Sequence, residues 1–488
     1  MMSGRPPTPR GQAVLMGLIF LLVFSSYLTI QGFAVQLYGE ALASDMEFVL
    51  YAVFTVSCFA APAVVNVLGP RRSLLLGVLG YAALVLASLL LATVGGPGAT
   101  PAVVTACRAG VVGGGALLGL GAAVLWTAQG RLMLEWSDGT DQGALFSIFW
   151  GLFNTAAVAG GLTTFVYFSR AHVTAPAPLY ILFLGLIITG AAATQLLAPD
   201  GTPHDATAPR ARQGGAGGGE ALEAPLLREA RSSCGAAWRE TRSTLALFGT
   251  RRMAFLAPFF FYTGFNQPYQ LNTFGDRYFS APTLGLALCL FYASEIAGGF
   301  VAGRILDRGA PARAAPAQLA LFSVLTAGGY AAAASTWRQA NHAAHLSLPG
   351  DGWSLAGPAA AFCLWGLSDS QAQAYSYWVL RQTHTTGAAQ ARAVGFYKMV
   401  QSLGWCIGFA LVPADRCPPL VQMGLTAMCG AVGVALAALA MPRGGVEAAD
   451  GMAAARDLCT MEDTTAGGAS GGNSRGSQRA CGGSGREV

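Results

Sequence analysis

Apolar residues dominate the chain in long runs, which turn signals interrupt at fairly regular intervals. Windows of 18 or more residues with almost no charge recur along the sequence, and this is typical of helices that cross a bilayer. The pattern predicts twelve such spans, with boundaries good to about two to four residues. They fall near 14–37, 47–67, 73–94, 102–126, 143–168, 179–198, 253–273, 283–304, 316–336, 354–378, 393–413 and 419–441. We therefore expect an all-α protein that is integral to a membrane.

The composition agrees with a membrane protein and gives no sign of an enzyme. Hydrophobic residues make up 53% of the chain and charged residues 11%, whereas soluble domains carry about 25% charged residues. The ten cysteines stand singly, without a C-x-x-C pair. His342 and His345 form H-x-x-H but lack the glutamate and the third ligand of a zinc site. We expect no catalytic residue, cofactor, metal or nucleic-acid partner; the bilayer is the expected surrounding.

Basic residues predict the orientation of the spans, because cytoplasmic loops collect them. With the N-terminus inside, 23 basic residues fall in inner segments and four in outer loops. Both termini are therefore predicted to be cytoplasmic, and either the plasma membrane or an endomembrane fits. Gly/Pro-rich and Gly/Ser-rich stretches predict disordered segments, solvated or partner-binding. The expected parts are a cytoplasmic N-terminus (1–13), a six-helix half (14–198), a largely disordered cytoplasmic linker (199–252), a second six-helix half (253–441) and a disordered cytoplasmic tail (442–488).

The two groups of six spans contain related segments. "NVLGPRRS" and "DRGAPARA" begin 241 residues apart, the tryptophans of "AAVLWTAQG" and "AFCLWGLSDSQ" lie 239 apart, and "FWGLFN" and "FYKMVQ" begin 247 apart. Three pairs at nearly one offset indicate an internal duplication. We expect two pseudo-symmetric halves around a central cavity.

Five segments together resemble the Unc-93-like family, a branch of the major facilitator superfamily, and its plant and fungal members in particular. They are "YAVFTVSCFAAPAVVNVLGPRRSLLLGVLGYA", "GLGAAVLWTAQGRLMLEW", "FSIFWGLFNTAAVAGGL", "LWGLSDSQAQAYSYW" and "GFYKMVQSLG". The resemblance implies the major facilitator fold of twelve transmembrane helices. It also implies secondary transport of an unidentified small solute or ion by alternating access. The alternative is a non-transporting regulatory or trafficking partner of an ion channel or receptor.

The superfamily's gating motif, Gly-x-x-x-Asp-Arg-x-Gly-x-Arg, is only partly present in this sequence. The residues that match it are Gly69 and Arg71 after span two, and Gly303, Asp307 and Arg308 after span eight. Asn66 stands where the first motif has aspartate. We therefore expect the charge pair that latches the inner gate to be missing from the first half.

Three ionisable residues lie within spans of the second half. Lys398, which is the only lysine of the chain, lies about 9 Å from the cytoplasmic end of its span, Asp369 about 8 Å and Glu295 about 12 Å. Isolated charges at this depth are costly, so we expect the three to pair in one layer facing the interior. The group could form a coupling site for a proton or cation, or a structural ion pair; Lys398 could also extend to the interface.

Polar residues of neighbouring positions complete the candidate site. Gln373 follows Asp369 by one helical turn, and Gln401 shares a helix face with Lys398. Asn266 and Gln270, beside Pro268 in span seven, are predicted to line the cavity opposite these residues. Trp126 and Trp365 are expected to anchor the membrane interfaces.

Overall fold

The computed structural model describes residues 8–441, except 33, 97, 138–140, 170–176, 199–234, 236, 237, 239, 338–345, 347–351, 385 and 414. His342, His345, the predicted tail and most of the predicted linker lie outside these residues. The bounds of linker and tail therefore stay predictions. The described part of the chain is almost entirely helical, as the apolar pattern predicts.

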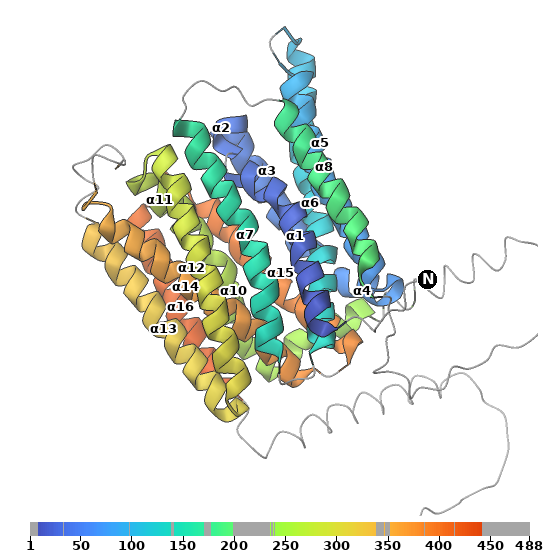
Figure 1. Ribbon diagram of the computed structural model, residues 1–488, viewed down its shortest axis with the longest axis vertical. Helices are drawn as coiled ribbons and strands as arrows, with labels where there is room; N and C mark the ends of the chain where they lie inside the picture. The colour runs from blue at the N-terminus through green and yellow to red at the C-terminus, as the bar shows by residue number, and fades with distance from the viewer. Residues whose placement is uncertain are drawn as a thin grey trace, which may run out of the picture. The chain divides into compact units, whose positions relative to one another are not determined.

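The helices follow the predicted spans in order and form one bundle (Figure 1). The first half contains α1 (Pro9–Gly32), α2 (Ala34–Tyr38), α3 (Glu40–Ser57), α4 (Ala61–Leu68), α5 (Pro70–Thr93), α6 (Pro101–Trp136), α7 (Gln142–Ser169) and α8 (Ala177–Ala193). The second contains α10 (Arg251–Gln267), the π-helix η4 (Pro268–Thr273), α11 (Phe274–Tyr278), α12 (Ala281–Arg308), α13 (Pro311–Thr336), α14 (Ala356–Thr383), α15 (Gly387–Leu411) and α16 (Pro419–Leu439). Of two short 3-10 turns, η1 (Thr194–Leu196) precedes the predicted linker and η3 (Leu247–Gly249) lies in its last part.

Among the described residues, eight helices are long and apolar enough to cross a membrane, or nine when α3 and α4 are counted together. The remaining three predicted spans correspond to α10, α14 and α15. These helices contain many polar side chains, such as Asn266, Asp369 and Lys398, and these side chains are buried. The polar side chains that lower the mean hydropathy of α10, α14 and α15 therefore face protein and not lipid.

Three spans differ in detail from the sequence pattern. Span two is bent by 61° between α3 and α4, where Pro62 cannot donate a hydrogen bond to the preceding turn. Span four continues past its predicted end to Trp136, because the polar residues Thr127 and Gln129 are buried in the bundle. Span seven widens at Pro268 into the π-helix η4.

The two halves meet on two sides. On one side α7 packs along α12, and on the other α15 packs against α3 and α6. Glycines permit the closest approach: a Cβ on Gly143 would lie 2.6 Å from the carbonyl oxygen of Gly303. On the other side, a Cβ on Gly130 would collide with Val394. Each half thus contributes helices that contact the other directly, and the space between these contacts forms the cavity.

Candidate functional site

A cavity of about 1020 Å³ lies between the two halves. Its walls come from α1, α3, α6 and α7 of the first half and from α10, η4, α12, α14 and α15 of the second. It reaches Ser280 and Pro413, which stand at helix ends that the charge pattern predicts to be extracellular. It ends deeper in the bundle at Glu295, Gln373, Lys398 and Gln401. Four of the seven candidate site residues therefore line one cavity.

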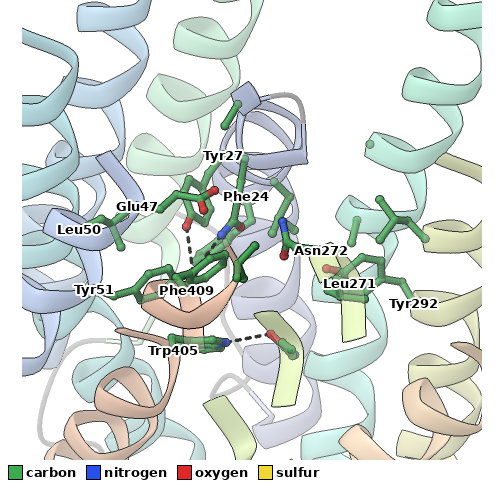
Figure 2. A pocket seen from close by; sticks show the side chains of 18 of the residues that line it. Phe24, Tyr27, Glu47, Leu50, Tyr51, Leu271, Asn272, Tyr292, Trp405 and Phe409 are labelled. Carbon is green, nitrogen blue, oxygen red and sulfur yellow. Dashed lines mark hydrogen bonds between the residues drawn. The ribbon is translucent and has the colours of Figure 1, made fainter. Parts of the chain in front are cut away.

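The part of the cavity nearer its mouth has aromatic walls with a few polar groups (Figure 2). The hydroxyls of Tyr27 and Tyr51 lie 3.3 Å apart, and the amide of Gln31 donates to Tyr51 at 3.0 Å. The carboxylate-bearing Glu47 lies beside these tyrosines and is 8% exposed. Glu47 is not among the site residues that the sequence predicts. It stands at the edge of predicted span two, where a charged residue is expected to lie at the membrane interface.

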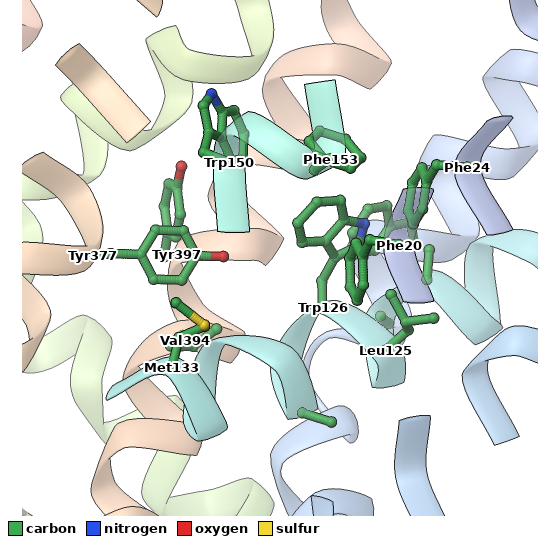
Figure 3. Close-up of a cluster of buried hydrophobic side chains, with 14 of the residues drawn as sticks. Phe20, Phe24, Leu125, Trp126, Met133, Trp150, Phe153, Tyr377, Val394 and Tyr397 are labelled. Carbon is green, nitrogen blue, oxygen red and sulfur yellow. The ribbon is translucent and has the colours of Figure 1, made fainter. Parts of the chain in front are cut away.

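Lys398 is enclosed by aromatic rings at the inner end of the cavity. Its side chain is 2% exposed, and Nζ donates to Oε1 of Gln401 at 2.8 Å. Nζ also lies 4.4 Å from the ring centre of Trp126 and 4.7 Å from that of Tyr397. Figure 3 shows Trp126 and Tyr397 within the buried cluster that surrounds this position. The lysine is thus held inside the protein by cation–π contacts and does not extend to the interface.

The prediction that Trp126 and Trp365 anchor the interfaces is wrong. Trp126 stacks edge-on with Phe20, Phe24 and Phe153 inside the first half (Figure 3). Trp365 is fully buried in the second half. The large rings of both tryptophans pack in the protein core. The sequence could not tell this, because a tryptophan in an apolar segment fits both the core and the membrane interface.

Glu295 of α12 bonds to the opposite half. Its Oε2 accepts hydrogen bonds from Nε1 of Trp150 at 3.1 Å and from Nδ2 of Asn154 at 2.8 Å. Both donors belong to α7. Oε1 is buried and has no hydrogen-bond partner among the described residues. One acid of the candidate site is therefore linked across the interface between the halves.

Asp369 lies behind the cavity wall, and a chain of amides connects it to Lys398. Nε2 of Gln373 lies 3.5 Å from Oδ2 of Asp369, and Oε1 of Gln373 accepts from Gln401 at 3.3 Å and from Tyr397. Gln401 in turn contacts Lys398. Among the described residues, neither acid lies within ion-pair distance of Lys398. The expected direct pairing of charges is thus replaced by amide and aromatic contacts.

Asn266 and Gln270 do not line the cavity. They face into the second half, where Nδ2 of Asn266 lies 3.5 Å from Oδ1 of Asp369 and 3.4 Å from Oε1 of Gln270. Their helix neighbours Gln267 and Thr273 line the cavity instead. The sequence places all four in one polar segment, but only the rotation of the packed helix decides which of them reach the cavity.

At the end opposite the cavity mouth, a linker residue joins the two halves. Glu240 accepts two hydrogen bonds from Arg392 of α15, at 2.6 and 2.8 Å, and one from Nδ2 of Asn66 at 3.1 Å. Asn66 also accepts from Arg131 at 3.0 Å, and Arg131 pairs with Glu135. A carboxylate is therefore present beside the position where the gating motif lacks its aspartate, and the linker supplies it.

The second half closes the same end through the gating-motif residue Asp307. Its carboxylate accepts from the backbone N–H groups of Gly143 at 2.6 Å and Ala144 at 2.7 Å, in the first turn of α7. A helix N-terminus stabilises a carboxylate in this place. Gly303 provides the close approach described above, whereas Arg308 is exposed.

Gly69 and Arg71, which match the gating motif in the first half, have roles within that half. Gly69 has φ of 82° and separates α4 from α5, a conformation that favours glycine. Arg71 donates to the backbone carbonyl of Gln195 and to its side chain. Neither residue contacts the second half through a hydrogen bond that the described residues make.

Helix order, a cavity between two halves and closure at one end together define a membrane protein of the major facilitator type. Solved structures with this fold support the assignment at 11–13% identity. A bacterial homologue of the iron transporter ferroportin, in an outward-facing state with soaked iron, matches with a TM-score of 0.59 over 88% of this chain and 98% of its own. The E. coli fucose:proton symporter matches with 0.57 over 89% and 98%, and the proton:xylose symporter bound to 6-bromo-6-deoxy-D-glucose with 0.58 over 89% and 95%.

Comparisons of sequence show which family of proteins with this fold the chain is similar to. The family model "Ion channel regulatory protein UNC-93" matches residues 46–276. UNC93-like protein 1 of Arabidopsis thaliana is 25% identical over 78% of this chain and 78% of its own length. An UNC93-like protein of Schizosaccharomyces pombe is 25% identical over 76% of this chain and 69% of its own. These matches confirm the resemblance to the Unc-93-like family, and the chain has the major facilitator fold.

Proposed function

We propose that this protein is a secondary transporter that moves a small solute or ion by alternating access. The cavity between the halves carries the proposal, because it has a mouth at one end and is closed at the other. Exchange of the open and closed ends would expose the same residues to the two sides of the membrane in turn. In this proposal, the present arrangement faces the predicted extracellular side.

The two charges at the inner end of the cavity are the proposed substrate or coupling groups. Glu295 is held by Trp150 and Asn154, and Lys398 lies over Trp126. All three partners belong to the first half. A rocking movement of one half against the other would therefore separate Glu295 from Trp150 and Asn154, and Lys398 from Trp126, at the same time. This is the physical link that coupled transport requires, since binding must favour one arrangement of the halves over the other.

The test is solute-driven ion flux into liposomes that contain the purified protein and a pH-sensitive dye. A panel of labelled small solutes is applied outside, and their uptake is counted as well, with a proton, sodium or potassium gradient as the driving force. We expect flux with at least one class of solute, lost in Glu295→Gln and Lys398→Met. Asp45→Asn, which makes the same change of carboxylate to amide at an exposed position, should transport normally.

A second function fits the family description, which names an ion channel regulator. The replacement of the gating aspartate by Asn66 also favours a protein that does not cycle. In that case the protein binds a channel or receptor within the membrane and controls its activity or delivery. Absence of flux with every solute, together with co-purification of a channel whose current changes when the protein is removed, would favour this function over transport.

A further inference from the structure

A second polar cluster lies inside the second half, separate from the cavity. It consists of Asp369 on α14, Tyr262 and Asn266 on α10, Gln270 on η4 and Tyr330 on α13. Each of these five side chains is 9% exposed or less, and none lines the cavity. The cluster is therefore a buried polar region, called the chamber below, to which four helices of one half contribute.

Asp369 brings a carboxylate into this chamber, and the positive charge that acts on it, Lys398, lies beyond ion-pair distance. Its polar contacts from Asn266 and Gln373 are both 3.5 Å long, whereas N–H···O bonds usually measure about 2.7–3.2 Å, and Gln267 also contacts it. No lysine, arginine or histidine of the described chain lies within ion-pair distance of it. A buried carboxylate so loosely contacted is costly unless a cation joins it.

The other members of the cluster present further polar atoms without partners. Within 3.5 Å, Oδ1 of Asn266, Nε2 of Gln270 and the hydroxyls of Tyr262 and Tyr330 form no hydrogen bond among the described residues. The hydroxyl of Tyr330 also faces Thr426, Tyr262 and Gln270. The amide orientations of Asn266 and Gln270 can be exchanged without changing their shape, so either amide can turn its oxygen to the chamber. Asn266 therefore lies next to Asp369, and Gln270 and the two tyrosines belong to the same buried cluster.

The local backbone supports a binding role. Asn266 and Gln270 flank Pro268, where α10 changes into the π-helix η4. Short π-helical segments often mark functional positions, and interrupted membrane helices coordinate ions in other transporter folds. The π segment also divides the side chains of this region between the cavity and the chamber.

We propose that Asp369, Asn266, Gln270, Tyr262 and Tyr330 form a buried site for an alkali cation. One carboxylate matches the single charge of such an ion, and amide and phenol oxygens are hard neutral ligands. Divalent calcium sites usually contain several carboxylates. A cation would neutralise Asp369 and at the same time bind the side-chain oxygen of Asn266, which has no partner among the described residues. Gln373 lines the cavity and contacts Asp369, and so marks the route of entry.

The site deepens the proposed transport function, since a cation held here would be the coupling ion. Binding in the chamber would draw Gln373 toward the cation and change its contacts with Gln401 and Tyr397. Those contacts lead to Lys398. An ion in the second half would thereby alter the inner end of the cavity.

The experiment measures cation binding directly and needs no solute. The full-length protein in detergent is heated in NaCl or KCl and in choline chloride of equal concentration, and radioactive sodium binding is counted in parallel. We expect a saturable rise in melting temperature with an alkali cation but not with choline, absent in Asp369→Asn. Tyr262→Phe, which removes one hydroxyl, should weaken binding about tenfold, in the range typical of supporting groups at metal sites.

Asp45→Asn is the matched control and should keep the wild-type response. Equal responses of wild type and Asp369→Asn, or the absence of any response to sodium and potassium in the wild type, would overturn the site. Binding and transport can fail separately: a protein that transports without alkali-cation binding keeps the proposed function and loses the site. A protein that binds the cation and carries no solute keeps the site and loses the carrier function.

Discussion

Glu240 of the linker and Arg392 of α15 form a two-pronged ion pair, with Nε and one terminal nitrogen of the guanidinium 2.6 and 2.8 Å from the two carboxylate oxygens. The same carboxylate accepts a hydrogen bond from Asn66 at the end of α4. Three parts of the chain thus meet at one carboxylate: the first half, the linker and the second half. Paired bonds of this geometry fix orientation as well as contributing energy.

The pair is expected to hold the inner end closed. Reversal of one charge, Glu240→Arg, should favour opening of that end, and the double variant Glu240→Arg/Arg392→Glu should restore closure. The measurement is the rate at which a membrane-impermeant thiol reagent modifies Val394→Cys, applied from the linker side, with the native cysteines replaced. Val394 packs on Gly130 at the closed end.

Glu220→Arg, another charge reversal in the linker, controls for net charge and should leave the modification rate unchanged. If Glu240→Arg reacts no faster than the parent protein, or if the double variant stays as reactive as the single one, the pair does not close this end.

Acidification should weaken the same contact in a defined range. The hydrogen bonds from Arg392 lower the pKa of Glu240 below its usual value of 4.5, against the opposing effect of partial burial, and Asn66 and Arg131 lower it further. A lowered pKa gives stability that is complete above the usual value and is lost as the pH falls through the lowered one. The melting temperature of the wild type should therefore exceed that of Glu240→Gln by a constant amount above about pH 5. This difference should shrink below pH 4.5. An excess that grows on acidification would contradict this assignment.

Gly303 should tolerate no side chain where α12 crosses α7. A Cβ there would collide with Ser147 and lie 2.6 Å from the carbonyl oxygen of Gly143. Gly303→Ala should therefore destabilise the protein by about 1–3 kcal/mol, as overpacking of a close contact does. Gly424→Ala on α16 is the control, because a Cβ at Gly424 meets nothing within 4 Å. Thermal unfolding of the two variants in detergent should separate them, and similar melting temperatures would refute the close contact.

Glu295 should respond differently to the loss of its charge and to the loss of its side chain. Glu295→Gln keeps an oxygen that can accept from Trp150 and Asn154, so we expect a normal melting temperature with loss of transport. Glu295→Ala leaves both buried donors without a partner, which should cost about 1–3 kcal/mol for each group. Thermal unfolding and liposome flux, measured on both variants, distinguish the two roles. Equal stability of the two variants would show that the hydrogen bonds across the halves do not hold.

Several features followed from the sequence because they depend on local pattern. Long apolar runs require helices in a membrane, since every backbone group must be bonded within its own segment. The positions of the twelve spans and the repeat of the two halves are therefore readable along the chain. So is the burial of Asp369, Lys398 and Glu295, because charges within a span must avoid lipid.

Only the tertiary structure decided which neighbours these residues have. Whether Asn266 faces the cavity or Asp369 depends on the rotation of α10, which packing against α15 and α16 sets. The aromatic enclosure of Lys398 by Trp126, and the meeting of Glu240 with Asn66, join residues more than 170 positions apart. Contacts at such separation leave no periodic signal, because they arise from how rigid helices stack and not from the order of residues within one.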